Sequence, residues 1–88
     1  MRSTATPEFW SRFRRLPQDV RQLAEVKYEL WQSNPQHPSL RFRRLQGFDD
    51  LYTVRIGEQH RALAHVRGNE ARWVWIGGHD EYERIIHS

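Results

Sequence analysis

Residues 60–78, HRALAHVRGNEARWVWIGG, are the stretch that decides how this chain folds. Apolar and polar side chains alternate from His60 to Val66, which is typical of a strand with one covered face. Residues 67–70 carry the signal of a tight turn, and residues 71–76 are mostly apolar without alternation. A run of that kind indicates a central strand that is covered on both faces. The stretch therefore predicts a β-hairpin whose second strand lies inside a sheet.

Two strands are expected before this hairpin. Residues 51–56 place every second side chain on one apolar face, and the turn at residues 57–59 joins them to the hairpin. Residues 40–43, LRFR, alternate apolar and basic side chains, so we expect a half-buried strand in which Arg41 and Arg43 project from the same face. Together with the hairpin, these segments predict a meander of three or four antiparallel strands.

The region before the strands carries the signals of two helices. Thr6 and Pro7 form a helix start, and apolar residues recur at helical spacing up to Leu16. Pro17 ends this helix, and the same spacing returns over residues 18–32. The two segments therefore predict an antiparallel helical hairpin.

The end of the chain completes the expected fold. Residues 80–86 follow the glycine pair at residues 77–78 and predict a short C-terminal helix. The order of the elements predicts the α+β class, with the N-terminal antiparallel helical hairpin packed on a three- to four-stranded antiparallel sheet. The sequence contains no linker, repeat or low-complexity segment, so we expect residues 1–88 to form one domain.

Arginine dominates the basic residues of the chain. Of the 88 residues, 14 are Lys or Arg and 11 are Asp or Glu, which gives a net charge of +3, and Lys27 is the only lysine. Because arginine grips phosphate in a fork and stacks on bases, the composition favours a polyanionic partner, namely nucleic acid or an acidic protein or both. The arginines of the expected helices are either solvated or face such an acidic partner; they are Arg12, Arg14, Arg15 and Arg21.

The sequence also excludes several classes of protein. It has no cysteine, which excludes disulfides, thiolate metal sites and cysteine catalysis. No apolar run approaches the roughly 18 residues that cross a bilayer. The polar start at residues 1–7 lacks the apolar segment of a signal peptide. We therefore expect a cytoplasmic protein.

Four arginines on the expected strands form the first candidate site. Arg41 and Arg43 lie on one strand, and Arg55 and Arg61 lie near the turn that joins the next two strands. Four guanidinium groups that converge on an exposed sheet face would hold a phosphodiester. The alternatives are a solvated sheet face and a surface that binds an acidic segment of a partner protein.

Residues 77–82, GGHDEY, form the second candidate site. The glycines let the chain turn sharply and leave room for a substrate, and His79 then lies where a general acid or base is useful. Tyr82 follows one helical turn later. In the alternative reading, Asp80 and Glu81 merely favour a helix start and Tyr82 packs on the core. The His79-Asp80-Glu81 cluster is a less favoured metal candidate, because no second cluster has ligand spacing.

The four tryptophans are many for this length, and we expect most of them in the core. Trp73 and Trp75 are expected to share one face of their strand, where one of them would be able to stack on a base.

Three stretches of the chain are distinctive in their order and spacing. They are NPQHPSLRFRRL at residues 34–45, YTVRI at residues 52–56 followed by HRAL at residues 60–63, and WIGGHDEY at residues 75–82. With them, the chain resembles the RelE/ParE superfamily of bacterial type II toxins from about residue 6 to residue 86. The family fold, a twisted antiparallel sheet against an N-terminal helix pair, agrees with the pattern above. Members usually begin with a short strand, for which only residues 2–5 are available here.

The resemblance implies one of two activities. RelE-like members cut messenger RNA in the ribosomal A site, ParE-like members poison DNA gyrase, and an antitoxin neutralises both. Arg61 matches a recurring family arginine, His79 falls where nuclease members carry a basic side chain, and Tyr82 matches a nearby tyrosine. Arg41, Arg43 and Arg55 fall among positions where relatives carry lysine or arginine.

We therefore expect the toxin of a type II toxin–antitoxin system that acts as a metal-independent, cofactor-free endonuclease on messenger RNA at the ribosome. The alternatives are a gyrase inhibitor without catalysis and a non-toxic homologue that only binds an antitoxin. The expected partners are a cognate antitoxin, messenger RNA and the ribosome, or DNA gyrase in the alternative. The expected catalytic residues are Arg55, Arg61, His79 and Tyr82, and the expected phosphate-binding residues are Arg41 and Arg43.

Overall fold

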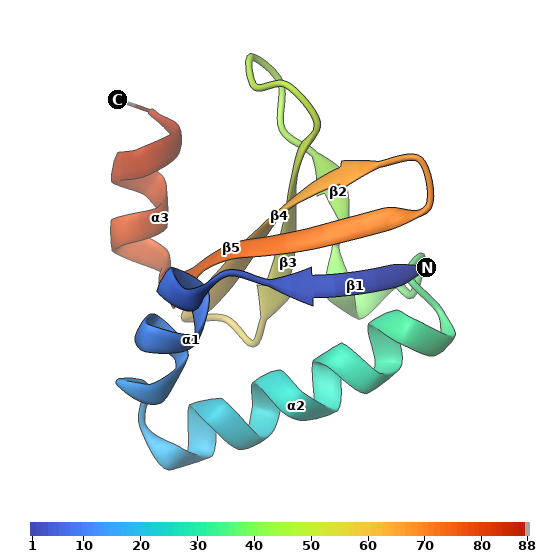
Figure 1. Cartoon of the computed structure of the whole chain (residues 1–88). Coiled ribbons are helices and arrows are strands. Elements are labelled where there is room, and N and C mark those ends of the chain that lie inside the picture. Colours follow the sequence, from blue (N-terminus) through green and yellow to red (C-terminus); the bar gives the residue numbers. More distant parts are fainter. Residues whose placement is uncertain (88) are drawn as a thin grey trace.

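One five-stranded sheet, with helices against both of its faces, forms the frame of the structure (Figure 1). The structure is a computed structural model that describes residues 1–87. In chain order the elements are β1 (Arg2–Ala5), α1 (Pro7–Arg14), α2 (Gln18–Ser33), the 3₁₀ turn η1 (Pro38–Leu40), β2 (Arg43–Arg44), β3 (Leu51–Ile56), β4 (His60–Arg67), β5 (Glu70–Gly78) and α3 (His79–Ile86). The strands lie in the order β1-β5-β4-β3-β2. Every neighbouring pair is antiparallel except β1 and β5, which are parallel.

The α+β class and the helical pair over the sheet are confirmed, and the hairpin of β4 and β5 lies inside the sheet. The sheet has one strand more than the residue pattern predicts. This strand, β1, occupies the room that the family resemblance left for it, and it pairs with β5 so that Ala5 lies opposite Trp73. Four residues are too few to show alternation, and the pairing partner lies near the other end of the chain.

The strand expected at residues 40–43 is wrong. Pro38 begins a single 3₁₀ turn that ends at Leu40, whose side chain is fully buried. Arg41 then has a φ of 47°, a left-handed conformation that bends the chain sharply. The paired strand begins only at Arg43. Burial of Leu40 thus stabilises a turn at the start of residues 40–43, where the alternation of apolar and basic residues alone predicts an extended strand.

The helices α1 and α2 cover one face of the sheet and enclose the first core with it. The helix α1 begins as predicted, since the Thr6 hydroxyl accepts a hydrogen bond from the Phe9 N–H at 3.1 Å and Pro7 is the first helical residue. Trp31 of α2 is fully buried, and its ring meets that of Trp73 edge-on at 5.1 Å. Within residues 1–87, no helix is long and apolar enough to cross a membrane.

A β-bulge in β5 turns its two tryptophans to opposite faces of the sheet. Leu63 of β4 pairs with Trp75, and Ala64, the next residue, pairs with Trp73. Val74 is therefore an extra residue without a direct partner, and it shifts the alternation by one position. The expectation that Trp73 and Trp75 share a face is wrong for this reason. Both are buried, so neither offers a ring face to a nucleic-acid base.

Trp75 belongs to a second core, which α3 covers on the other face of the sheet. This core contains Leu51, Leu63 and Tyr82 as further buried members. At Gly77, a Cβ atom would lie 2.7 Å from the Trp75 ring. The missing side chain therefore makes room for an indole, and not for a substrate as the sequence suggested.

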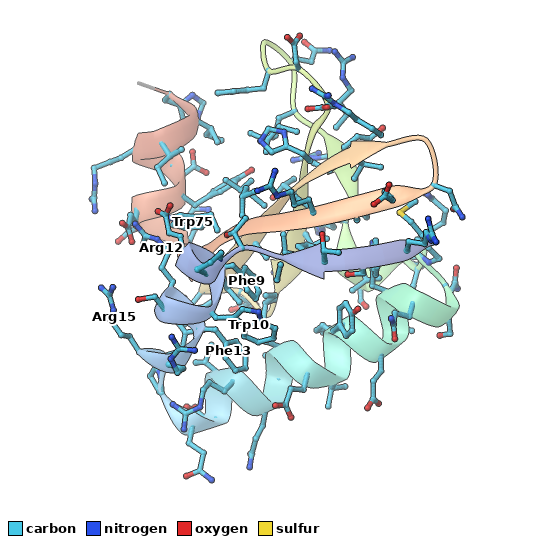
Figure 2. All side chains as sticks on the ribbon, viewed as in Figure 1. Phe9, Trp10, Arg12, Phe13, Arg15 and Trp75 are labelled. Atoms are coloured by element: carbon cyan, nitrogen blue, oxygen red, sulfur yellow. The ribbon has the colours of Figure 1, made fainter. Side chains whose placement is uncertain are left out.

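Arg12 links α1 to this second core, as Figure 2 shows. Its guanidinium lies over the Trp75 ring, 5.5 Å from the ring centre, and its Nη1 atom lies 3.3 Å from Oε2 of Glu81 in α3. One of the helix arginines expected to be solvated or to face a partner thus holds two helices of the chain together.

The loop between β2 and β3 is fastened to β4 through Asp50. Its carboxylate accepts hydrogen bonds from Arg67 and from His65, the latter at 2.8 Å. The hydrogen bond from Arg67, followed by that from His65, holds the pKa of Asp50 below its usual value. This loop carries Leu45 and Phe48 against the second core.

We predict that Gly77→Ala lowers the free energy of unfolding by about 1–3 kcal/mol, because the added methyl group displaces the Trp75 ring. Urea unfolding followed by tryptophan fluorescence measures the change. Gly78→Ala is the matched control, since the nearest atom to its Cβ is the Gln59 carbonyl oxygen at 3.9 Å. Equal losses in the two variants would contradict the packing argument.

Candidate functional site

All six residues that the sequence singled out line one cavity of about 320 Å³ on the α3 side of the sheet. We call it the arginine cavity; its predicted members are Arg41, Arg43, Arg55, Arg61, His79 and Tyr82. Five further residues complete its lining: Leu45, Thr53, Glu83, Ile86 and His87. Four guanidinium groups and two imidazoles thus face one carboxylate. The charge balance favours an anionic ligand.

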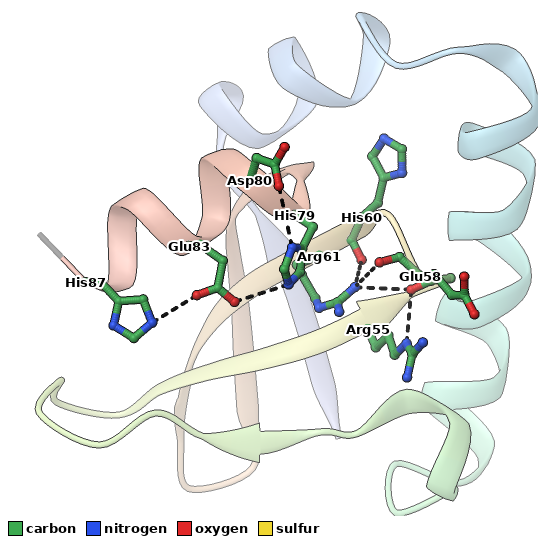
Figure 3. Close-up of polar contacts among 9 residues, drawn as sticks. Arg55, Glu58, His60, Arg61, His79, Asp80, Glu83 and His87 are labelled. Carbon is green, nitrogen blue, oxygen red and sulfur yellow. Dashed lines mark hydrogen bonds and ion pairs between the residues drawn. The ribbon is translucent and has the colours of Figure 1, made fainter.

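Arg55 and Arg61 are directly opposite each other on β3 and β4, and the turn between these strands holds both. Nε of Arg55 donates to the Gly57 carbonyl oxygen at 3.2 Å, and Nη1 of Arg61 donates to the same oxygen at 3.1 Å. Nη1 of Arg61 also lies 3.3 Å from the Glu58 carbonyl oxygen and 2.8 Å from that of His60 (Figure 3). Backbone carbonyls therefore fix two like charges side by side.

Burial is the main cause that lowers the pKa of Arg61, and the neighbouring charge of Arg55 lowers it further. The pKa of an arginine is so high that the side chain stays charged all the same. The three bonds of Arg61 use Nη1, so its Nε and Nη2 donors take part in none of them. A bound phosphate would satisfy donors of this kind and relieve the repulsion between the two arginines.

His79 is the first residue of α3, and the turn before β4 also fixes its place. Its backbone N–H donates to the Gln59 carbonyl oxygen at 2.8 Å. Its ring Nε2 lies 3.1 Å from Oε1 of Glu83, and the other oxygen of that carboxylate lies 2.9 Å from Nε2 of His87. The Glu83 carboxylate thus bridges two imidazoles, while Asp80 is 3.8 Å from Nδ1 of His79.

Tyr82 lines the cavity, yet only 5% of the residue is exposed. Its ring packs with the Trp75 ring at a centre distance of 6.5 Å and lies 6.2 Å from the His79 ring. The alternative prediction, that the Tyr82 ring packs on the core, is therefore confirmed. A ring this buried has no free face on which a base could stack.

Arg41 and Arg43 reach the cavity from two different elements and not from one strand. Arg41 is the left-handed residue that follows η1, and Arg43 lies in β2 opposite Thr53 of β3. Their common position at the cavity wall is a result of the turn at Arg41.

Sequence reasoning missed three polar residues of the cavity. Glu83 and His87 continue the spacing of His79 at every fourth residue, so the helical period alone would have placed all three on one face of α3. Thr53 is two residues before Arg55 and shares its strand face; its buried hydroxyl oxygen has no hydrogen-bond partner among the described residues. Within residues 1–87, no group of three histidine or acidic side chains is arranged to hold a metal ion, which leaves the metal reading of residues 79–81 without support.

A second hollow, of about 510 Å³, lies between α1, α2 and the sheet, and we call it the aromatic groove. Phe9, Trp10, Phe13 and Tyr28 contribute to its lining, and Figure 2 labels the first three. Trp10 is 46% exposed, which is unusual for so large an apolar side chain. Apolar surface of this kind is typical of a site that another protein covers.

Comparison with known proteins places the chain in a family. A family model described as the ParE-like toxin domain matches residues 18–84. No curated protein sequence matches the chain at a significant level.

Solved structures with the same fold are known from archaea and bacteria. A chain of the RelB–RelE antitoxin–toxin complex from Methanococcus jannaschii matches with a TM-score of 0.76 and 17% identity, over 93% of this chain and 96% of the other. The YoeB/ParE toxin from Agrobacterium tumefaciens matches with a TM-score of 0.71 and 16% identity, over 90% and 99% of the two chains. A chain of the intact RelBE toxin–antitoxin complex from E. coli matches with a TM-score of 0.67 and 16% identity, over 86% and 93%. Identities this low show the fold alone.

We predict that Glu83→Ala moves the imidazole ¹⁵N signals of both His79 and His87 in an NMR spectrum, because both Nε2 atoms lose the same neighbouring carboxylate. Asp80→Ala is the control, and it should leave the signals of His87 in place, since Asp80 approaches only His79. If Glu83→Ala moved neither set of signals, the bridging arrangement would be refuted.

Proposed function

The chain belongs to the ParE-like toxin domain family of the RelE/ParE superfamily, and we propose that it is a toxin that cuts messenger RNA on the translating ribosome. The observation that carries the proposal is the arginine cavity, which sets four arginines beside a histidine at the end of the sheet. A messenger RNA phosphodiester is an anion that this lining can hold, and an imidazole is the side chain best suited to move a proton near neutral pH. With such a target, the protein acts in the cytoplasm.

The proposed reaction can proceed without a metal ion. The ribose 2′ oxygen attacks the adjacent phosphorus, and the bond from phosphorus to the 5′ oxygen breaks. A base takes the 2′ proton, an acid protonates the leaving 5′ oxygen, and cations stabilise the charge that grows on the phosphate. Arg55 and Arg61 are the cations fixed most firmly, because the carbonyl oxygens of the turn hold them. We assign to these two residues the stabilisation of the charge on the cleaved phosphate. To Arg41 and Arg43 we assign the binding of the neighbouring RNA backbone.

Proton transfer falls to the groups of the cavity that titrate easily. Arginine stays protonated, so none of the four arginines exchanges a proton readily. His79 is held at the start of α3 and lines the same cavity as Arg61, and we assign one of the two proton transfers to it. Tyr82 remains a candidate only through its hydroxyl, since its ring is buried.

Gyrase inhibition without catalysis is the main alternative within the superfamily, and a homologue that binds an antitoxin without being toxic is another. Purified protein added to programmed ribosomes and, separately, to gyrase with supercoiled DNA distinguishes the three. Cleaved messenger RNA supports the proposal. Inhibited supercoiling without RNA cleavage supports the gyrase alternative, and no effect in either assay supports the inert homologue.

The aromatic groove is the surface at which we propose that an antitoxin binds. Two of the similar structures, from Methanococcus jannaschii and E. coli, are complexes of a toxin with an antitoxin. The groove is apolar and opens between two helices, which suits an amphipathic segment of a partner protein. It lies across the sheet from the arginine cavity, because the two hollows adjoin different cores.

We predict that His79→Ala lowers the rate of messenger RNA cleavage about 10²- to 10⁴-fold, the usual contribution of a general acid or base. His60→Ala is the control, because the His60 ring points away from the cavity (Figure 3) and does not line it. Both variants should unfold at the wild-type urea concentration and bind the antitoxin normally. Wild-type cleavage by His79→Ala would sink the assignment.

We predict that Trp10→Ala weakens antitoxin binding about tenfold or more, as for other exposed aromatic anchors, and leaves cleavage unchanged. Val26→Ala is the matched control, since Val26 of α2 is 59% exposed but does not line the groove. Isothermal titration calorimetry measures both affinities, and urea unfolding confirms that both variants are folded. An unchanged affinity for Trp10→Ala would place the antitoxin elsewhere.

A further inference from the structure

The proposed reaction needs two proton transfers, and the sequence offered only His79 and Tyr82 for them. Apart from the arginines, four titratable side chains line the arginine cavity: His79, Tyr82, Glu83 and His87. Tyr82 is the most buried of them, with its ring in the second core. Each carboxylate oxygen of Glu83 already lies within ion-pair distance of one imidazole. Of these four side chains His87 is the most exposed, and its imidazole is the second one in the cavity that is suited to move a proton near neutral pH.

The Glu83 carboxylate places the two imidazoles relative to each other. Nε2 of His79 lies 3.1 Å from one oxygen, and Nε2 of His87 lies 2.9 Å from the other, so one carboxylate separates the two rings. The contacts join side chains one helical turn apart along α3. A carboxylate this close to an imidazole favours its charged form and one orientation of the ring, as the third group does in nucleophile–base constellations.

The two histidines differ in how they meet the solvent. The His79 side chain is 37% exposed at the start of α3, whereas the His87 side chain is 72% exposed just beyond the end of that helix. His87 can therefore exchange protons with water more easily. The charged and titratable groups around the pair in the cavity are Arg41, Arg43, Arg55, Arg61, Tyr82 and Glu83, with Asp80 beside His79.

We propose that His87 is a second catalytic residue, which forms with His79 an acid–base pair that Glu83 positions for cleavage of a phosphodiester. One imidazole takes the proton of the ribose 2′ hydroxyl as its oxygen bonds to phosphorus. The other gives a proton to the 5′ oxygen as its bond to phosphorus breaks. The products are a 2′,3′-cyclic phosphate and a 5′ hydroxyl, and the two histidines have exchanged protonation states. This inference rests on the proposed nuclease function.

The first test is kinetic. His87→Ala should lower kcat for messenger RNA cleavage on programmed ribosomes about 10²- to 10⁴-fold. Its KM should stay within a factor of about 3, because the four arginines that hold the phosphate are untouched. His60→Ala is the control for loss of a histidine outside the cavity. Since His87 is largely exposed, the variant should keep the wild-type unfolding curve.

The second test separates the acid from the base. A synthetic messenger RNA with sulfur in place of the 5′ bridging oxygen at the cleaved bond has a leaving group that departs without a proton. The variant that lacks the acid should recover cleavage of this substrate, and the variant that lacks the base should not. Recovery by one of His79→Ala and His87→Ala alone supports the pair. Recovery by both, or by neither, overturns it.

The outcomes distinguish this inference from the function on which it rests. If the wild-type protein cleaves no messenger RNA on ribosomes, the nuclease function fails and the acid–base pair fails with it. If the wild-type protein cleaves and His87→Ala cleaves with the same kcat, the nuclease function stands and only the role of His87 is refuted.

Discussion

The extra residue in β5 is the constraint on which both cores of this protein depend. Because Val74 has no direct partner in β4, Trp73 faces α1 and α2 and Trp75 faces α3. Without the bulge both indoles would lie on one face, and the other face would lose its largest apolar side chain. The Trp75 ring fits only because Gly77 has no side chain, and the Arg12 guanidinium of α1 lies over it. The bulge therefore also decides how α1 meets α3.

The turn between β3 and β4 performs the equivalent task for the site. Its backbone carbonyl oxygens accept from Arg55 and Arg61, and the Gln59 carbonyl oxygen accepts from the His79 N–H that begins α3. A short turn thus brings together guanidinium groups from two strands and an imidazole from a helix. Main-chain atoms thus orient this part of the site without help from a ligand.

The residue pattern identified all six candidate residues that line the cavity, because alternation, helical period and family resemblance each carry local information. It failed where long-range packing overrides local preference. Burial of Leu40 turned an expected strand into a 3₁₀ turn, and the bulge at Val74 reversed an expected face. Glu83 and His87 were within reach of the helical period, whereas the pairing of Arg12 with Glu81 joins residues at opposite ends of the chain and has no local signal.

By itself, the sequence determined the α+β class, the helical pair, the central hairpin and the excess of arginine over lysine. These follow from periodicity, proline and glycine positions and composition, which act over a few residues. Only the tertiary structure decided which arginines gather in one cavity and that Arg12 instead pairs with Glu81 between two helices. It also decided that the Glu83 carboxylate lies between two histidines. Those arrangements depend on strand register and on the docking of α3, and both are set by contacts between residues far apart in the chain.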